Sequence, residues 1–330
     1  MPQYPRIDNA GGLWKLPEIA NYRIGGYWPD VGCRALFGGG RTPSESDVID
    51  YIEIVSTGNA TDFGNLQSTK YNMGTGSNGT RGTFFGGYDG YPTESNVIDY
   101  ITIDSTGNAA DFGDLTVARG STSGLSNRTR GIAAGGGDSS TGHENVIDYF
   151  AIASTGNAVD YGDLTQARGQ GGTVNNATRG IHGGGIIATN DNQDTIDFFE
   201  IATTGNAVEF GDLLAEVNYI AGCSNSTRGV FSGGQSPANT DVRQFITMAS
   251  LGNAIDFGDT TVTSSRNAAT SNSIRGIFAP GNNPDSTNII EYFTISSTGD
   301  GIDFGDLSVG RANLRATSDG HGGLTEGFDR

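Results

Sequence analysis

Short apolar runs, each bounded by Gly, Asn or Ser, recur along the whole chain. No segment sustains the 3.6-residue period of an amphipathic helix, so these runs predict β-strands. In residues 146–152 (VIDYFAI), apolar side chains fall on both faces of the expected strand. A sheet with one solvent-exposed face would alternate apolar and polar residues instead. The pattern therefore indicates small sheets that are covered on both faces.

The run at 146–152 belongs to a phrase that occurs six times, most clearly as NVIDYFAIASTGNAVDYGDL at 145–164. The gaps between successive copies are 49, 49, 49, 47 and 47 residues, measured at the central glycine of the S-T-G-N turn: Gly58, Gly107, Gly156, Gly205, Gly252 and Gly299. Every repeat contains four strand-like runs: one rich in Ser, Thr, Gly and Asn, one of the form R-G-x-x-x-G-G, the long apolar run, and a short run with an aromatic residue. A repeat of this length suits one four-stranded blade of a β-propeller, in which radial repetition also protects strand edges.

We expect a single all-β domain with seven blades, and a ring of six blades with two decorated ends is the alternative. Residues 31–310 hold the six repeats. Residues 311–330 read like the first two strands of a further blade, and residues 1–30 read partly as its last two strands and partly as a docking segment. A closing blade made from both ends would pair strand edges that are otherwise left open.

Several features of the repeat resemble the kelch motif. In one copy these are the diglycine Gly135-Gly136, then Tyr149 on the long strand, the downstream aromatic Tyr161, and Arg168 before the next run. The resemblance covers nearly the whole chain and implies a kelch-like β-propeller. It departs from kelch in the blade tryptophan, which is replaced here by an aromatic residue of another type at Phe63, Phe112, Tyr161, Phe210, Phe257 and Phe304.

The wording V-I-D-Y-I-x-I-x-S-T-G-N-A-x-D-F-G-D-L also resembles repeats in virion proteins of tailed phages, particularly marine and cyanobacterial ones. The opening G-L-W-x-L followed by Tyr27-Trp28-Pro29 is similar to a segment near such repeats. This resemblance implies a structural or fibre protein of a virion, with other virion proteins as partners and a glycan or protein of the host surface as a further candidate. It implies no catalytic residues. The sequence leaves open whether the chain forms a homo-oligomer.

The chain of 330 residues carries a net charge of −18, and its only lysines are Lys15 and Lys70. An acidic surface repels phosphate groups, so nucleic acid and anionic membranes are not expected partners. No stretch approaches the roughly 20 apolar residues of a membrane span, and the N-terminus lacks the basic and apolar regions of a signal peptide. We therefore expect synthesis in the host cytoplasm and assembly into a virion.

The candidates for chemistry favour no enzyme. The histidines His143, His182 and His321 occupy unrelated repeat positions, and Cys33 and Cys223 do not correspond either, so neither set predicts a metal site or a disulfide. An Asp recurs at Asp50, Asp99, Asp148 and Asp197, with Gln244 and Glu291 in its place in the last two repeats. An Arg recurs at Arg34, Arg81, Arg130, Arg179, Arg228 and Arg275. A catalytic site is normally single, so both sets are expected to form hydrogen bonds within or between blades.

No cofactor is expected, and Ca²⁺ at the acidic turn of residues 108–114 is the one metal considered. That turn lacks the dense order of carboxylates in an EF-hand loop. Recognition is expected where the repeat is broken, because variable loops on a rigid scaffold commonly bind partners. The interaction candidates are Trp14, Tyr27, Trp28, Tyr88 and Tyr91. The expected function is thus a non-enzymatic virion propeller for particle assembly or host attachment; the alternatives are a carbohydrate-binding or carbohydrate-active propeller and a cellular kelch-type interaction scaffold.

Overall fold

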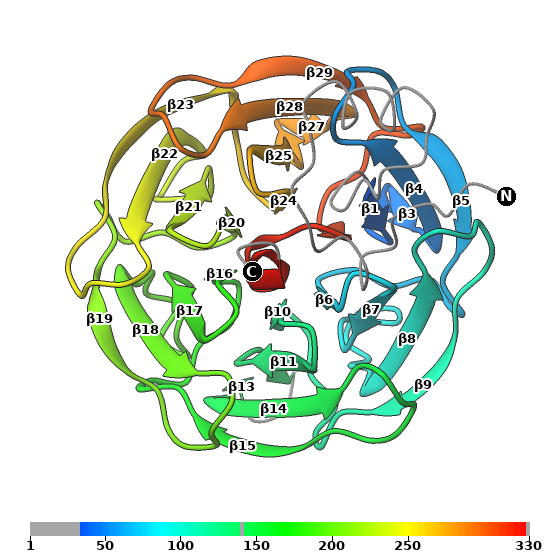
Figure 1. Cartoon of the computed structure of the whole chain (residues 1–330), viewed down its shortest axis with the longest axis horizontal. Helices are drawn as coiled ribbons and strands as arrows, with labels where there is room; N and C mark the ends of the chain where they lie inside the picture. The colour runs from blue at the N-terminus through cyan, green and yellow to red at the C-terminus, as the bar shows by residue number, and fades with distance from the viewer. Residues whose placement is uncertain (1–33, 139–141, 328–330) are drawn as a thin grey trace, which may run out of the picture.

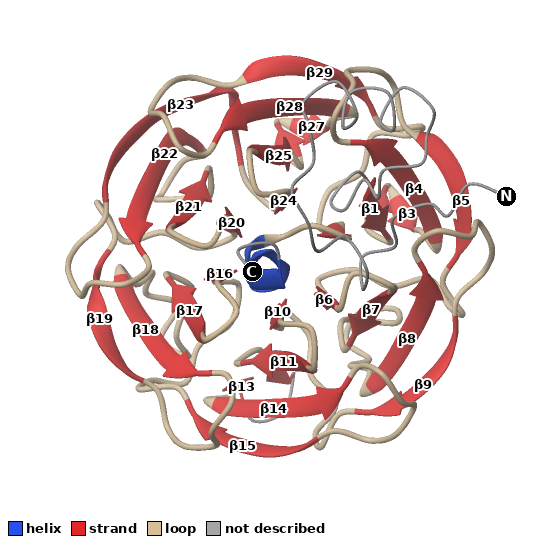
Figure 2. Ribbon diagram, viewed as in Figure 1, coloured by secondary structure: helices blue, strands red, loops and turns tan. Residues whose placement is uncertain are grey.

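A computed structural model describes residues 34–138 and 142–327, which form six four-stranded antiparallel sheets. The sheets are arranged as blades around a central axis, with the first strand of each blade innermost (Figures 1 and 2). The described part of the chain is therefore an all-β propeller with almost no helix, as the repeat predicts. In blades 2 to 6 the four runs of the repeat become the four strands in order, from the axis outwards.

The blades are built alike, and their strands are given from the axis outwards. Blade 1 is made of β30 (Arg315–Ser318), β1 (Arg34–Gly38), β4 (Val48–Glu53) and β5 (Thr61–Asn65). Blades 2 and 3 are made of β6 (Gly74–Ser77), β7 (Arg81–Phe85), β8 (Val97–Thr102) and β9 (Ala110–Asp114), and of β10 (Ser123–Ser126), β11 (Arg130–Ala134), β14 (Val146–Ala151) and β15 (Val159–Asp163). Blade 4 is made of β16 (Gly172–Asn175), β17 (Arg179–Gly183), β18 (Thr195–Glu200) and β19 (Val208–Asp212). Blades 5 and 6 are made of β20 (Ala221–Ser224), β21 (Arg228–Ser232), β22 (Thr240–Thr247) and β23 (Ile255–Ser264), and of β24 (Ala268–Ser271), β25 (Arg275–Ala279), β28 (Ile289–Thr294) and β29 (Ile302–Asp306).

The described residues form six blades and not the seven that we expected. The C-terminal strand β30 pairs antiparallel with β1, with Ala35 opposite Ser318 and Gly38 opposite Arg315. It supplies the inner strand of blade 1, because the first repeat starts at its second strand. The tail therefore completes an existing blade, and residues after it form the short 3₁₀ helix η2 (Gly322–Gly327) where a second strand was expected. The N-terminal segment, expected to supply the rest of a seventh blade, lies outside the described residues.

The S-T-G-N hairpin of each blade docks onto the outer strand of the preceding blade. In blade 3, the Oδ1 of Asn157 accepts a hydrogen bond of 3.1 Å from the backbone N–H of Asp114 in blade 2. The N–H of Gly156 donates to the carbonyl of Phe112 over 2.8 Å. The same side-chain contact joins every neighbouring pair of blades, with Asp300 replacing the asparagine once. The residues that recur in this motif therefore form contacts between blades as well as the hairpin itself.

The core lies between the blades. In each blade, an aromatic residue of the third strand packs edge-on against the aromatic residue of the fourth strand, as Tyr100 does against Phe112 at 5.9 Å between ring centroids. Phe112 in turn packs against Phe150 of the next blade at 5.3 Å. These side chains fill the space between neighbouring blades, and Phe112 and Phe150 are each 2% exposed. Apolar residues on both faces of the third strand are explained by this double coverage.

The repeated aspartates form buried ion pairs with cations in the segments that connect the blades. Arg119 follows blade 2 and contacts Asp148 of blade 3, with 3.0 Å between Nη2 and Oδ2 and both side chains fully buried. Thr116 donates to the same carboxylate through its backbone N–H and its hydroxyl. The equivalent pairs in three other blades are Lys70–Asp99, Arg168–Asp197 and Arg311–Asp50. Each pair fixes a connecting segment to the blade that follows it.

A closed ring of hydrogen bonds joins the last residues of the six inner strands. Each side chain donates to the backbone carbonyl of the preceding blade, as Ser126 does to Ser77 over 2.8 Å. The ring consists of Ser77, Ser126, Asn175, Ser224, Ser271 and Ser318. The helix η2 lies over this end of the axis (Figure 2), where the ring of His321 contacts Ser126 and Ser77. Because Ser318 belongs to β30, the C-terminal strand also completes this ring.

Candidate functional site

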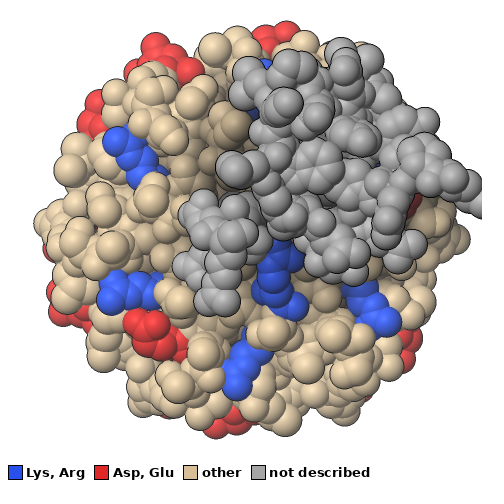
Figure 3. Space-filling view, viewed as in Figure 1, with Lys and Arg blue, Asp and Glu red and all other residues tan. Residues whose placement is uncertain are grey.

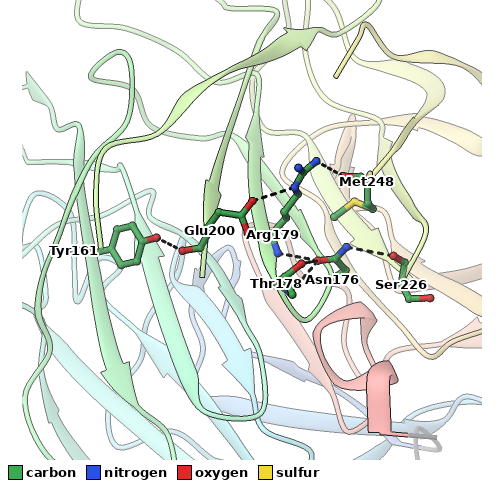
Figure 4. Close-up of polar contacts among 7 residues, drawn as sticks. All are labelled: Tyr161, Asn176, Thr178, Arg179, Glu200, Ser226 and Met248. Atoms are coloured by element: carbon green, nitrogen blue, oxygen red, sulfur yellow. Dashed lines mark hydrogen bonds and ion pairs between the residues drawn. The ribbon is translucent and has the colours of Figure 1, made fainter. Parts of the chain in front are cut away.

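The repeated arginines occupy structural positions on the face that carries η2. Arg179 donates from Nη1 to the carbonyl of Met248 in the next blade over 3.1 Å, and its Nε donates to Glu200 over 3.2 Å (Figure 4). Its guanidinium also lies over the ring of Phe198, 5.1 Å from the centroid. The equivalent Nη1 bond to the next blade is made by all six arginines. The expected hydrogen bonds between blades are therefore present.

Basic side chains on this face are separated from one another. Figure 3 shows isolated basic side chains spaced around the coloured part of the face, with acidic side chains mainly at the rim. Each repeated arginine is half-buried and engaged by its neighbours. The basic groups thus hold blades together, and the visible part of this face offers no continuous basic stripe for a polyanion.

The opposite end of the axis holds a pocket of about 910 Å³. The inner strands start at this end, and the variable loops after each diglycine lie around it. Three of these loops form small two-stranded hairpins: β2 (Arg41–Thr42) with β3 (Ser44–Glu45), β12 (Gly137–Asp138) with β13 (Gly142–His143), and β26 (Asn282–Asn283) with β27 (Asp285–Ser286). The first and third of these hairpins line the pocket. The pocket thus lies where the sequence of the repeat varies most.

One equivalent position from each of the six repeats surrounds the pocket. It carries six residues of five types, at the same 49- and 47-residue spacing as the turns: Asn72, Ser121, Gln170, Tyr219, Arg266 and Asn313. We call these residues the pocket ring. All six have φ between 52° and 63°, a left-handed conformation that is uncommon outside glycine. The chain therefore keeps an unusual backbone at this position in every blade while it changes the side chain.

Two members of the pocket ring have an acceptor atom that no other group satisfies. Asn72 and Asn313 are each 5% exposed, and the Oδ1 atom of each has no hydrogen-bond partner. The Nδ2 of Asn72 contacts the hydroxyl of Ser121 at 3.5 Å, which orients the amide. Buried polar atoms are normally paired, and an unpaired one costs about 1–3 kcal/mol. Both oxygens are themselves buried, and they belong to residues that line the pocket.

The wall of the pocket is a cluster of tyrosines. Tyr88 stacks on Tyr71, with 5.3 Å between ring centroids and 29° between planes, and Tyr91 lies 5.6 Å from Tyr88. A Cβ on Gly120 would approach the Tyr88 ring to 2.2 Å, so a glycine is required beneath that ring. Burial raises the pKa of both Tyr71 and Tyr88, which keeps their hydroxyls protonated. Tyr91 is 70% exposed and is the outermost of the three.

Two arginines line the same pocket without a carboxylate partner. The guanidinium of Arg41 lies 5.3 Å from the centroid of Tyr71, and that of Arg266 lies 4.8 Å from the centroid of Tyr219. Neither forms an ion pair among the described residues, and the Arg41 side chain is hydrogen-bonded to Tyr71. Asp285 is the carboxylate among the lining residues. The described lining residues therefore carry two positive charges and one negative charge, and Glu45 and Glu94 lie close enough to raise the pKa of Tyr71 and Tyr88 further.

The structure unites some of the expected site residues and separates others. Tyr88 and Tyr91 meet at the pocket, whereas Trp14, Tyr27 and Trp28 lie outside the described residues. His182 is fully buried between strands, and burial lowers its pKa well below the usual value. The Oδ1 of Asn108, in the turn considered for Ca²⁺, accepts a hydrogen bond from Asn65. Within residues 34–138 and 142–327, no group of three or more His, Cys, Asp or Glu side chains is placed to hold a metal ion.

The pocket ring and Arg41 were not recognised in the sequence. The residues of the pocket ring differ in chemistry from one repeat to the next, so in the sequence they resemble ordinary variable positions between the segments that all six repeats share. The signal that could have revealed them is their constant distance from the S-T-G-N turn, because a fixed offset in a closed ring places six residues around one axis. Arg41 gave no comparable signal, since it lies in a loop of variable length.

Comparison with known proteins provides no family assignment. No protein-family model matches the chain, and no curated protein matches it significantly. No helix within residues 34–138 and 142–327 is long and apolar enough to cross a membrane.

Proposed function

We propose that the chain is a non-enzymatic recognition and assembly protein of a virus particle, in which a rigid propeller presents its pocket face to a partner. The observation that carries this proposal is the pocket ring. Six blades share their backbone and core, yet they place six residues of five types around one pocket. Selection for folding alone would not require such differences, because the same residue could be used in every blade.

Rigidity supports the same function. The blades are joined by several independent sets of contacts. These are the docked hairpins, the buried ion pairs, the hydrogen bonds of the repeated arginines and the closed ring of hydrogen bonds at the ends of the inner strands. A surface held in this way loses little conformational entropy when it binds. Attachment of particles to a surface benefits from many such copies, since multivalency multiplies weak affinities. The virion assignment itself rests on the resemblance of the repeat phrase to tailed-phage proteins.

The proposal is tested by fractionating particles from the natural source on a density gradient. We expect the protein to sediment with the particles after a high-salt wash, and an antibody against it to label one defined part of them in electron micrographs. A host cytosolic protein serves as the negative control. Recovery of the chain only in the soluble fraction would contradict the virion assignment.

A carbohydrate-binding module is the second candidate. It is favoured by the tyrosine cluster beside the amide-bearing side chains of the pocket ring, since aromatic faces and amides together suit hydroxyl-rich ligands. This activity is compatible with a place on a particle, where it would serve host attachment.

A further inference from the structure

We propose that the pocket binds an acidic oligosaccharide, whose carboxylate is held by Arg266 and Arg41 and whose hydroxyl groups donate to Asn72 and Asn313. This inference deepens the proposed function, because it names the ligand class of the pocket face. Its chemistry can be examined on the purified protein without any particle.

The two arginines are placed on either side of one short segment. The N–H of Asn313 donates to the carbonyl of Arg266 over 3.0 Å, and the N–H of Arg41 donates to the carbonyl of Ala312 over 2.9 Å. Each guanidinium is supported by a tyrosine ring and has no carboxylate partner among the described residues. A guanidinium presents a planar fork of donors that matches a carboxylate. The two arginines therefore belong to adjacent segments of the pocket lining, and each guanidinium is suited to contact an anion there.

Hydroxyl recognition follows from the acceptors of the pocket ring. The free Oδ1 atoms of Asn72 and Asn313 require a donor, and sugar hydroxyls are donors that also accept. The arrangement differs from that needed by a polyphosphate. The described residues that line the pocket include no lysine and no helix N-terminus, and Asp285 adds a negative charge. A ligand with several negative charges would be poorly compensated by two arginines on a protein of net charge −18.

The aromatic wall completes the site. Tyr88 stacks on Tyr71 with its hydroxyl protonated, and Tyr91 extends the wall outwards. Tyr71 and Gly120 cover the two sides of the Tyr88 ring, so the apolar face that suits a pyranose ring is that of the exposed Tyr91. A volume of about 910 Å³ is large enough for more than one sugar unit. We therefore expect the outer tyrosine to contact a second unit of the chain.

The experiment compares acidic oligosaccharides with their methyl esters at physiological salt. Trisaccharides that contain glucuronate, galacturonate or sialate are titrated into the full chain by calorimetry, together with the matched methyl esters and with adenosine monophosphate. We expect at least one acid to bind, its ester to bind at least tenfold more weakly, and the nucleotide to bind more weakly than the acid. Binding of no acid, equal binding of acid and ester, or preferred binding of the nucleotide would each overturn the proposal.

The variants are chosen from residues that the chain already uses in the pocket ring. Arg266→Gln introduces the residue of the equivalent position 170, and Tyr219→Asn introduces that of positions 72 and 313. Both should fold, and Arg266→Gln should weaken the acid at least tenfold while the ester changes little. Arg228→Gln is the matched control, because Arg228 stacks on Phe245 at 4.6 Å on the opposite face. It should lower the melting temperature and leave binding unchanged; equal loss of binding in Arg228→Gln and Arg266→Gln would overturn the site.

The two proposals fail separately. A chain that is found on particles but binds no acidic sugar leaves the virion function in place and removes the pocket assignment. A chain that binds acidic sugar through Arg266 but never associates with particles leaves the pocket assignment in place and removes the virion function.

Discussion

Arg243 of blade 5 forms a buried ion pair with Glu291 of blade 6. This pair differs from those of the other blades in where its cation comes from. In the pairs described above the cation precedes the inner strand of the blade, but in blade 6 that position is Ser264. Arg243 replaces the isoleucine that stands at its position in the other blades, and thereby supplies the cation from a neighbouring blade. In blade 5 both charges are absent, with Val217 and Gln244 in their places. The chain thus changes both members of a buried pair together.

We predict that Arg243→Ile destabilises the fold by about 3–5 kcal/mol, because it leaves the Glu291 carboxylate buried and unpaired. The double variant Arg243→Ile with Ser264→Arg restores the arrangement of blades 1 to 4 and should recover most of this loss. Chemical denaturation monitored by tyrosine and tryptophan fluorescence measures both. Additive rather than compensating effects in the double variant would show that the two positions are not exchangeable.

The repeated arginines should act through stability alone. Arg130 donates to the carbonyl of Ile201 over 2.8 Å and lies 4.4 Å from the centroid of Tyr149. Arg130→Ala should therefore cost about 2–3 kcal/mol, since it removes a charge-assisted hydrogen bond and a cation–π contact. Thermal unfolding checks the first effect, and titration with an acidic trisaccharide checks that the pocket is unaffected. An unchanged melting temperature would refute the structural role.

Much of the fold could be predicted from the sequence, because the length of each blade and its strand pattern can be read directly from the repeat. The four strands per blade and the covered third strand follow from residues such as those of 146–152. The number of blades could not be read in the same way. Counting repeats does not reveal that β30 pairs with β1, and a tail that looks like a new blade is in fact the missing strand of the first one.

The site was harder to predict than the fold. Asp148 was recognised as structural, but its partner Arg119 was not, although Lys70, Arg119 and Arg168 follow one another at 49-residue steps. The series is broken at Val217 and Ser264, where the charge is lost or supplied by Arg243, so the pattern is visible only in three dimensions. Tyr88 and Tyr91, proposed from the sequence as interaction residues, lie together at the pocket, whereas the residues opposite them come from other blades.

The glycine of the fourth strand should be intolerant of substitution. Gly64 has φ of 146°, and a Cβ there would come within 2.4 Å of the carbonyl oxygen of Gly107 in the docking hairpin. Gly64→Ala should therefore destabilise by more than about 1 kcal/mol, through backbone strain and loss of docking. Gly58→Ala is the matched control, because nothing lies within 4 Å of its added Cβ. Similar melting temperatures for the two variants would show that the hairpin can move away without cost.

Stability should fall as the pH is lowered from about 6.5 towards 4, in part because of His321. Its Nδ1 accepts from the N–H of Gly323 and its Nε2 lies 3.2 Å from the carbonyl of Ser77, so the neutral ring is required. Burial lowers its pKa to about 4, and the nearby charge of Arg128 acts in the same direction. Between the folded value and the ordinary value of about 6.5 the unfolded chain binds more protons, so the free energy of unfolding decreases as the pH decreases.

The measurement compares His321→Gln with the wild type by urea unfolding at pH 7 and pH 5, where most carboxylates stay ionised. The variant should lose less stability between these values than the wild type. His182, whose pKa is also lowered by burial, remains in both proteins and leaves a residual dependence. An identical loss in the two proteins would mean that His321 does not titrate in this range.

Closure of the ring should depend on β30 far more than on η2. A chain that ends at Asn313 keeps the Arg311–Asp50 ion pair but loses the inner strand of blade 1. It also loses Ser318, one of the six residues in the ring of hydrogen bonds at the ends of the inner strands. It exposes an unpaired edge of β1, so we expect it to be unfolded or aggregated at 25 °C. A chain that ends at Gly320 keeps β30 and should fold with a lower melting temperature. Adding a synthetic peptide of residues 311–330 to the shorter chain should restore its circular dichroism spectrum. If the shorter chain melts as cooperatively as the longer one without the peptide, the ring does not need its C-terminal strand.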